Sequence, residues 1–156
     1  MRIGFGYDVH AFEEGDSVTL GGVEIPFDKG IKAHSDGDVL IHSVIDAILG
    51  AAAIGDIGVL FPDTDPKYQD ADSRTLLREV RKLIEVNYEI GNLDVTVIAE
   101  RPKIKDYRDQ MVIQIASDLC TRVENISIKG TTSEKIGFVG REEGIAVASV
   151  CLLRFL

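Results

Sequence analysis

The sequence contains no tryptophan, only two cysteines and only four prolines among its 156 residues. Cys120 and Cys151 stand far apart with no CxxC spacing, which excludes a disulfide framework or a zinc ribbon. We therefore expect both thiols to be reduced and to lie in the core. No apolar run approaches the roughly 20 residues that a membrane-spanning helix needs. No stretch is rich enough in proline or serine to be a linker, so a single domain over residues 1–156 is expected.

Basic residues are also in short supply. The chain has 17 Lys and Arg against 26 Asp and Glu, a net charge of −9. This balance argues against a nucleic-acid binder, which needs a basic face. It does not exclude a phosphorylated ligand, because bound divalent cations can reverse the local field. The N-terminus shows no basic, apolar leader, which predicts a cytoplasmic (bacterial) protein, or one of a plastid-type organelle from which a leader was removed.

Apolar periodicity predicts an α/β (α+β) fold with a mixed four-stranded sheet, a small hairpin, and helices mainly on one face. Strands are expected at 2–12, 93–100, 126–129 and 145–155, and a hairpin at 17–27 that turns at Gly21 and Gly22. Helices are expected after the cap Asp38, from a cap at Ser73, and over 106–123. Residues 55–72 are rich in aspartate, glycine and proline, which predicts a loop.

The strongest pattern for chemistry joins Asp8, His10 and His42. Asp8 and His10 are two positions apart on a predicted strand, so both side chains leave the same face. His42 interrupts the apolar face of the first helix, and Asp38 and Asp46 lie one turn to either side of it. An Asp-His-His set is typical of a zinc site with an open fourth position, and Asp38 or Asp46 could fix the His42 tautomer. The alternative is a surface His10 and a hydrogen-bonded His42 without metal.

Three other segments are candidates for ligand binding. His34 and Ser35 precede the first helix, where free N–H groups favour an anion, although plain helix capping explains them equally well. The acidic loop from Gly55 to Asp65 suits hydroxyl recognition or a hard cation, or else is a solvated turn. A basic cluster at 101–108 and the hydroxyl run at 130–135 would suit a diphosphate, with Glu134 available to a second metal; the alternatives are a solvated face and a turn. No nucleophile accompanies a histidine, so covalent catalysis is disfavoured.

Six separated motifs together resemble one family from end to end. They are GYDVHAF, GGVEIP, AHSDGDVLIHSVIDAILGAAAIGDIG, FPDTD, AERPKI and TTSEKIGFVGREEG, in this order. In combination they are similar to 2-C-methyl-D-erythritol 2,4-cyclodiphosphate synthases of the non-mevalonate isoprenoid pathway. The resemblance implies a metal-assisted lyase reaction. In it, the 2-phosphate of 4-diphosphocytidyl-2-C-methyl-D-erythritol 2-phosphate attacks the β-phosphorus of the same molecule and releases CMP.

The resemblance also implies roles for individual residues. Zn²⁺, one per subunit, would be held by Asp8, His10 and His42, and a second ion, Mg²⁺ or Mn²⁺, by Glu134. His34 and Thr132 would be catalytic. The substrate would be bound by a set drawn from the motifs: Asp8, His10, His34, Ser35, Asp56, Ile57, Gly58, Phe61, Pro62, Asp63, Thr64, Asp65, Ala99, Lys103, Ile104, Lys105, Gly130, Thr131, Thr132, Ser133, Glu134, Phe138 and Arg141.

The family works as a homotrimer with sites between subunits, so the resemblance implies the same assembly here. An isoprenoid diphosphate on the trimer axis near Arg141 and Glu143 is a further expectation. Two departures from the family pattern stand out: Asp106, Tyr107 and Arg108 replace a Pro- and His-containing stretch, and Ser43 replaces a small apolar residue. The rival functions are a divalent-metal phosphohydrolase, which would activate water with the same ligands, and a non-catalytic trimeric module that binds a phosphate ligand.

Overall fold

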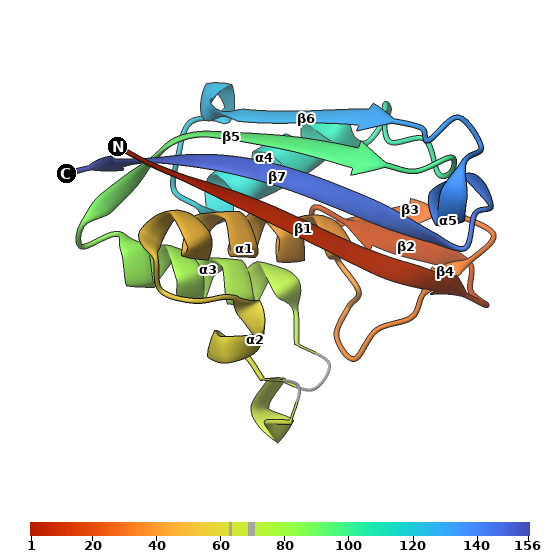
Figure 1. Ribbon diagram of the computed structural model, residues 1–156, viewed down its shortest axis with the longest axis horizontal. Coiled ribbons are helices and arrows are strands. Elements are labelled where there is room, and N and C mark those ends of the chain that lie inside the picture. The colour runs from red at the N-terminus through yellow and green to blue at the C-terminus, as the bar shows by residue number, and fades with distance from the viewer. Residues whose placement is uncertain (63, 69–70) are drawn as a thin grey trace.

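The computed structural model describes residues 1–62, 64–68 and 71–156. Figure 1 shows the elements along the chain. In chain order they are β1 (Arg2–Glu13), β2 (Ser17–Leu20), β3 (Val23–Pro26), β4 (Gly30–Ile31), α1 (Val39–Ala52), α2 (Ile57–Leu60), η1 (Pro66–Tyr68), α3 (Ser73–Ile84), β5 (Tyr88–Ile98), α4 (Arg108–Asp118), η2 (Val123–Asn125), β6 (Ile126–Thr131), α5 (Gly137–Gly140) and β7 (Gly144–Phe155). None of the helices in these ranges combines the length and apolar character needed to cross a membrane.

The main sheet has five strands in the order β4-β1-β7-β5-β6, and β2 pairs with β3 in a separate hairpin. Only the β5–β6 pair is parallel, so the sheet is mixed as predicted. The prediction of four strands was wrong, because a fifth strand, β4, pairs with the end of β1. Strand β4 consists of only two residues, Gly30 and Ile31. A two-residue strand is too short to carry an alternating pattern in the sequence.

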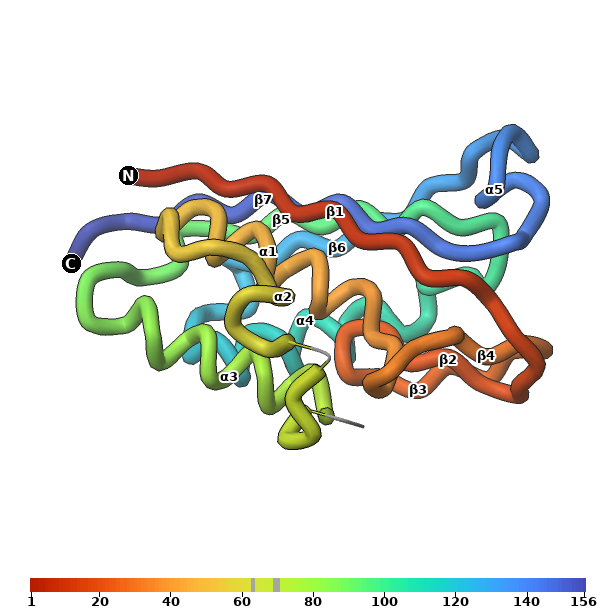
Figure 2. Tube along the Cα trace, turned by 60° about the horizontal axis from the view of Figure 1, so that its bottom comes forward, coloured from red at the N-terminus to blue at the C-terminus, as the bar shows by residue number. Residues whose placement is uncertain are grey.

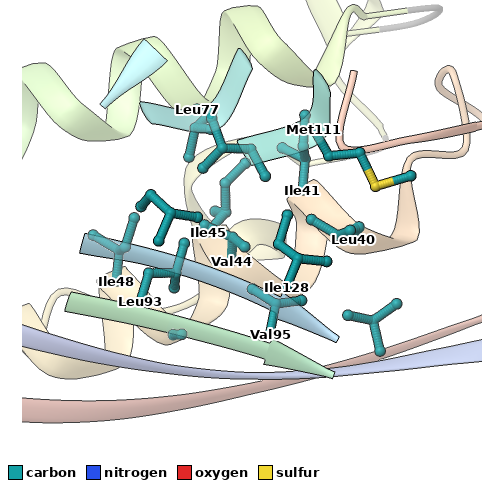
Figure 3. Packing of buried hydrophobic residues seen from close by; sticks show 14 of the residues in the cluster. Leu40, Ile41, Val44, Ile45, Ile48, Leu77, Leu93, Val95, Met111 and Ile128 are labelled. Carbon is teal, nitrogen blue, oxygen red and sulfur yellow. The ribbon is translucent and has the colours of Figure 1, made fainter. Parts of the chain in front are cut away.

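The long helices α1, α3 and α4 cover one face of the sheet, as the edge-on view of Figure 2 shows. The core lies between these layers. In Figure 3 Ile48 of α1 lies beside Leu93 of β5, and Ile41 of α1 lies near Met111 of α4. The opposite face of β1 carries large apolar side chains that are exposed in the single chain: Ile3, Phe5, Tyr7 and Val9.

Helix α1 lies directly on β1 because two glycines of the strand face it. A Cβ atom on Gly4 would lie 1.9 Å from the Ala47 carbonyl oxygen, and one on Gly6 would lie 2.0 Å from the Ser43 carbonyl oxygen. The Ser43 hydroxyl lies 2.8 Å from the Ser149 hydroxyl of β7, which gives the unusual buried serine beside His42 a polar partner. This close approach sets the position of α1 relative to Asp8 and His10 on β1.

Several predicted boundaries needed correction. The stretch 55–72 contains the short helices α2 and η1, and the cap of α3 is Asp72, whose side chain accepts from Arg74 N–H. Ser73 is therefore the first residue of the helix and not its cap. Strand β5 begins at Tyr88, earlier than expected, and α4 is shorter than predicted. Both cysteines are free, but only Cys151 is buried.

The exposure of Cys120 has a local cause. Helix α4 ends at Asp118, and Cys120 follows with φ of 50° in the turn that leaves the helix. The turn directs this residue outward, whereas Met111, Ile115 and Leu119 are buried. The expectation that both cysteines lie in the core was therefore wrong for Cys120.

A buried ion-pair network joins α3 to α4, and its loss should destabilise the fold. Asp118 is 5% exposed and accepts from Arg74 at 2.7 and 3.0 Å and from Arg78 at 2.9 Å. We expect Asp118→Ala to lower the free energy of unfolding by about 1–2 kcal/mol, because the charge-assisted hydrogen bonds of Asp118 are lost while the two guanidinium groups, 28 and 42% exposed, regain contact with water. Urea unfolding measures this change. The control Glu79→Gln, which breaks the exposed pair with Lys82, should have no measurable effect; equal stability of both variants would contradict the prediction.

Candidate active site

Three ligand atoms converge where α1 crosses β1. Asp8 Oδ2 lies 2.9 Å from His10 Nε2 and 3.3 Å from His42 Nδ1, and the two ring nitrogens are 3.4 Å apart. The side chains are 27, 16 and 12% exposed in that order. In the described ranges this is the one group of three or more metal-ligating side chains whose ligand atoms all lie within 4.8 Å of one another. An Asp-His-His donor set fits a tetrahedral zinc ion with an open fourth position.

The charges of this cluster suit a cation. Burial by itself raises the pKa of Asp8, but the hydrogen bonds and charges of His10 and His42 outweigh it and hold that pKa well below its ordinary value. For His10, burial acts to lower the pKa, and the hydrogen bond and charge of Asp8 raise it above the ordinary value. Asp8 is therefore ionised at neutral pH and ready to act as a ligand, and protons compete with a metal ion for His10.

The nitrogen of each imidazole that points away from the cluster has its own partner. His10 Nδ1 lies 3.3 Å from the Lys32 carbonyl oxygen, and His42 Nε2 lies 2.9 Å from the Ser73 hydroxyl. The sequence had suggested Asp38 or Asp46 as the partner of His42, which was wrong. Both carboxylates instead accept backbone N–H groups: Asp38 those of Gly21, Gly22 and Ile41, and Asp46 that of Ile57.

A cavity of about 380 Å³ opens beside His42. Its wall brings together seven of the residues that the sequence singled out: His34, Ser35, His42, Ile57, Gly58, Phe61 and Thr64. Ala33, Pro66, Tyr68 and Leu76 complete it. Three other expected residues do not line it: Asp56, which caps α2 through Val59 N–H, and Pro62 and Asp65. Asp63 lies outside the described residues.

A second cavity, of about 270 Å³, lies where β5 and β6 end. Seven expected residues line it: Ala99, Lys103, Ile104, Lys105, Gly130, Thr131 and Thr132. Val97, Pro102 and Arg108 line it as well. Arg108 adds a guanidinium group to the wall. The two cavities share no lining residue.

The remaining expected residues stand apart from both walls. Glu134 is exposed and has φ of 54°, and its Oε1 accepts from the Thr132 hydroxyl at 2.9 Å. The Ser133 backbone N–H donates to Glu100 at 3.2 Å. Phe138 is 36% exposed on α5, and Arg141 pairs with Glu143 at 2.8 Å. Within one chain Glu134 does not approach the Asp8, His10 and His42 cluster.

Comparison with known proteins places this arrangement in one family. The family model described as the YgbB family matches residues 1–154. The 2-C-methyl-D-erythritol 2,4-cyclodiphosphate synthase of Azotobacter vinelandii is 58% identical over 154 residues, 98% of each chain. The chain belongs to this synthase family. The resemblance carried by the six sequence motifs is thus confirmed.

Solved structures of the synthase family share the fold. The bifunctional IspDF of Campylobacter jejuni is 47% identical with a TM-score of 0.95; the match covers 99% of this chain and 42% of that longer chain. A Plasmodium falciparum protein described as an IspF CDP complex is 42% identical with a TM-score of 0.85, over 97% of this chain and 94% of that one. The similarity to this family therefore holds for the backbone structure as well as for the sequence.

Proposed function

We propose that the protein converts 4-diphosphocytidyl-2-C-methyl-D-erythritol 2-phosphate into 2-C-methyl-D-erythritol 2,4-cyclodiphosphate and CMP, as a phosphorus-oxygen lyase of the non-mevalonate pathway. The observation that carries this proposal is the convergence of Asp8, His10 and His42 beside a cavity, in a chain 58% identical to a synthase along its whole length. In the reaction an oxygen of the 2-phosphate bonds to the β-phosphorus. The bond from that phosphorus to the bridging oxygen breaks, and CMP leaves with the electron pair.

Both reacting groups belong to one substrate, so the protein has to fold the substrate and neutralise its charge. Asp8, His10 and His42 would hold the zinc ion, which supplies positive charge where the phosphoryl group is transferred. His34 and Ser35 lie ahead of α1 on the same wall and would orient the phosphates with the imidazole and the hydroxyl. Ile57, Gly58, Phe61 and Thr64 would enclose the erythritol part. The roles expected for Asp56, Pro62, Asp63 and Asp65 stay predictions.

The second cavity suits the cytidine half of the substrate. Ala99, Ile104 and Gly130 give it apolar walls, and Lys103, Lys105 and Arg108 give it positive charge. The CDP bound in the Plasmodium falciparum relative supports a nucleotide diphosphate here. The Thr132 hydroxyl would contact the phosphates, and the exposed Glu134 beside it would hold Mg²⁺ or Mn²⁺ together with substrate oxygens, since these ions keep few protein ligands. Ser133, Phe138 and Arg141 would contribute from the neighbouring loop.

We also propose a homotrimer in which the metal half of one site and the nucleotide half come from adjacent chains. The two cavities of one chain have no residue in common, although one substrate has to fill both. The face of β1 that α1 does not cover is apolar and exposed in the single chain, as expected of a subunit contact. Its side chains are those of Ile3, Phe5, Tyr7 and Val9. The isoprenoid diphosphate expected on the axis near Arg141 and Glu143 stays a prediction.

The affinity for zinc is expected to fall as the pH drops from about 8 to about 6. The pKa of His10 is raised in the metal-free protein, so this ring is protonated over a wider pH range and the proton has to leave before a metal ion binds. Competition with a chromophoric chelator at several pH values measures the affinity. Proton release on zinc addition, followed in weakly buffered solution, provides an independent check. An affinity that does not change over this range would contradict the prediction.

Phosphorus NMR of the purified protein with the cytidyl substrate, Zn²⁺ and Mg²⁺ tests the proposed reaction. We expect signals of a cyclic diphosphate and CMP, both abolished by EDTA and restored by added metal. Release of inorganic phosphate instead would replace the proposal with a metal-dependent phosphohydrolase. Tight substrate binding without any product would replace it with a non-catalytic binding module.

A further inference from the structure

Ser73 contacts the metal-ligand cluster from a helix that the sequence did not connect with it. It is the first residue of α3, is 0% exposed, and has its hydroxyl 2.9 Å from His42 Nε2. The same hydroxyl donates a short hydrogen bond to Asp36 Oδ1, and the Ser73 backbone N–H donates to Asp36 Oδ2 at 2.9 Å. Asp36 therefore holds Ser73 by its backbone and its side chain together.

Counting protons assigns a direction to this chain of hydrogen bonds. A serine hydroxyl has one proton to donate and two lone pairs to accept with. Asp36 accepts from Asp38 N–H at 3.1 Å as well as from Ser73, so its carboxylate acts only as an acceptor. The hydroxyl proton of Ser73 accordingly goes to Asp36, and the contact with His42 has to be donated by the Nε2–H of the imidazole.

This direction fixes the state of the metal-facing nitrogen once the ring is neutral, as a metal-binding imidazole has to be. A neutral imidazole carries one N–H, so a proton on Nε2 leaves a lone pair on Nδ1. Nδ1 is the nitrogen that faces Asp8 Oδ2 at 3.3 Å and His10 Nε2 at 3.4 Å. The Ser35 hydroxyl is a poorer partner for Nε2, because it lies 3.5 Å away and accepts from Gly37 N–H.

We propose that Ser73, held by Asp36, is the positioning residue that orients the ring of His42 and fixes its tautomer for metal binding through Nδ1. This inference rests on the metal-dependent function proposed above. It ties the metal site to the start of α3 and to the segment before α1. Removal of such an outer hydrogen-bond partner of a ligating histidine typically lowers the metal affinity about 10- to 100-fold.

The first test compares the zinc affinity of Ser73→Ala with that of the wild-type protein by chelator competition. We expect an affinity about 10- to 100-fold lower for Ser73→Ala. Thr75→Ala is the matched control: its hydroxyl lies in the same first turn of α3 and bonds Asp72, and the substitution leaves the His42 contact intact. This control should bind zinc as the wild-type protein does. Ser73→Thr keeps the hydroxyl and should restore affinity.

Asp36→Ala provides a second route, because Asp36 is exposed and its substitution removes no buried side chain. Without its carboxylate acceptor the Ser73 hydroxyl is free to turn toward Nε2, so zinc affinity should fall here too. Urea unfolding of each zinc-free variant separates this effect from a loss of stability. Unchanged affinity in both Ser73→Ala and Asp36→Ala would overturn the proposal and leave the proposed function standing.

Nitrogen-15 NMR of the zinc-loaded protein reads the tautomer directly. We expect His42 to carry its proton on Nε2, and this proton to exchange slowly with water in the wild-type protein and Thr75→Ala but quickly in Ser73→Ala. A proton on Nδ1 of the zinc-loaded wild-type protein would overturn the proposal. Failure of the wild-type protein to bind zinc would instead overturn the metal-dependent function, and this inference with it.

Discussion

His42→Ala is expected to abolish zinc binding and to lower the rate of CMP release by at least about a thousandfold. The substitution removes one of three ligand atoms at the crossing of α1 and β1, and Asp8 with His10 alone cannot complete the site. A bound metal contributes several kcal/mol to charge stabilisation in phosphoryl transfer, and each 1.4 kcal/mol or so is a factor of ten in rate. Elemental analysis of the purified protein and a CMP release assay measure the two effects.

Asp46→Asn is the matched control for His42→Ala. Asp46 lies one turn further along α1, and its carboxylate accepts only the Ile57 N–H among its described partners. Asparagine keeps a carbonyl oxygen for that bond, so zinc content and activity should stay close to those of the wild-type protein. If His42→Ala retained its zinc and its activity, the assignment of the metal site would be wrong.

Gly6→Ala is expected to destabilise the protein by about 3 kcal/mol or more, a large effect for one added methyl group. The new Cβ would lie 2.0 Å from the Ser43 carbonyl oxygen and 2.7 Å from the Ala47 backbone nitrogen. Both contacts are with backbone, so the helix as a whole has to move away from the strand. Since His42 precedes Ser43 on α1, zinc affinity should fall together with the free energy of unfolding.

Gly50→Ala tests the same interface where there is space. A Cβ at Gly50 would meet its nearest atom, the Phe5 carbonyl oxygen, at 3.9 Å, an ordinary contact. Alanine in a helix interior is favoured over glycine by up to about 1 kcal/mol, so this variant should be as stable as the wild-type protein or slightly more stable. Chemical unfolding of both variants measures the difference. Equal stability of Gly6→Ala and Gly50→Ala would contradict the close approach of α1 to β1.

The sequence predicted the metal cluster because two local periods carry it. The period of two on a strand puts Asp8 and His10 on one face, and the helical period shows His42 as a polar break in an apolar face. The contact between α1 and β1 is harder to predict from the sequence. Gly4 and Gly6 lie on one face of the strand, but they have no side chains and therefore leave no apolar pattern. No sequence pattern indicates that these glycines provide the contact surface for a helix.

Ser73 was missed because its role depends on a contact across the fold. It lies 31 positions from His42, and next to Asp72 it reads as a helix cap. The exposed Cys120 and the two-residue strand β4 were missed for a related reason, because each depends on a turn or a pairing too short to leave a pattern. Local signals therefore predicted the long elements and the group formed by Asp8, His10 and His42, whereas the contact of Ser73 with that group required the structure.

A subunit-mixing experiment tests most directly the central claim that one reaction site combines the metal half and the nucleotide half of adjacent chains. His42→Ala and the double variant Lys103→Ala, Thr132→Ala are co-expressed with different tags, and mixed assemblies are isolated on both. Each variant alone should be nearly inactive. In every mixed trimer one of the three sites combines two intact halves, so about a third of the wild-type activity should return. Mixed assemblies as inactive as the separate variants would contradict the claim and assign the whole site to a single chain.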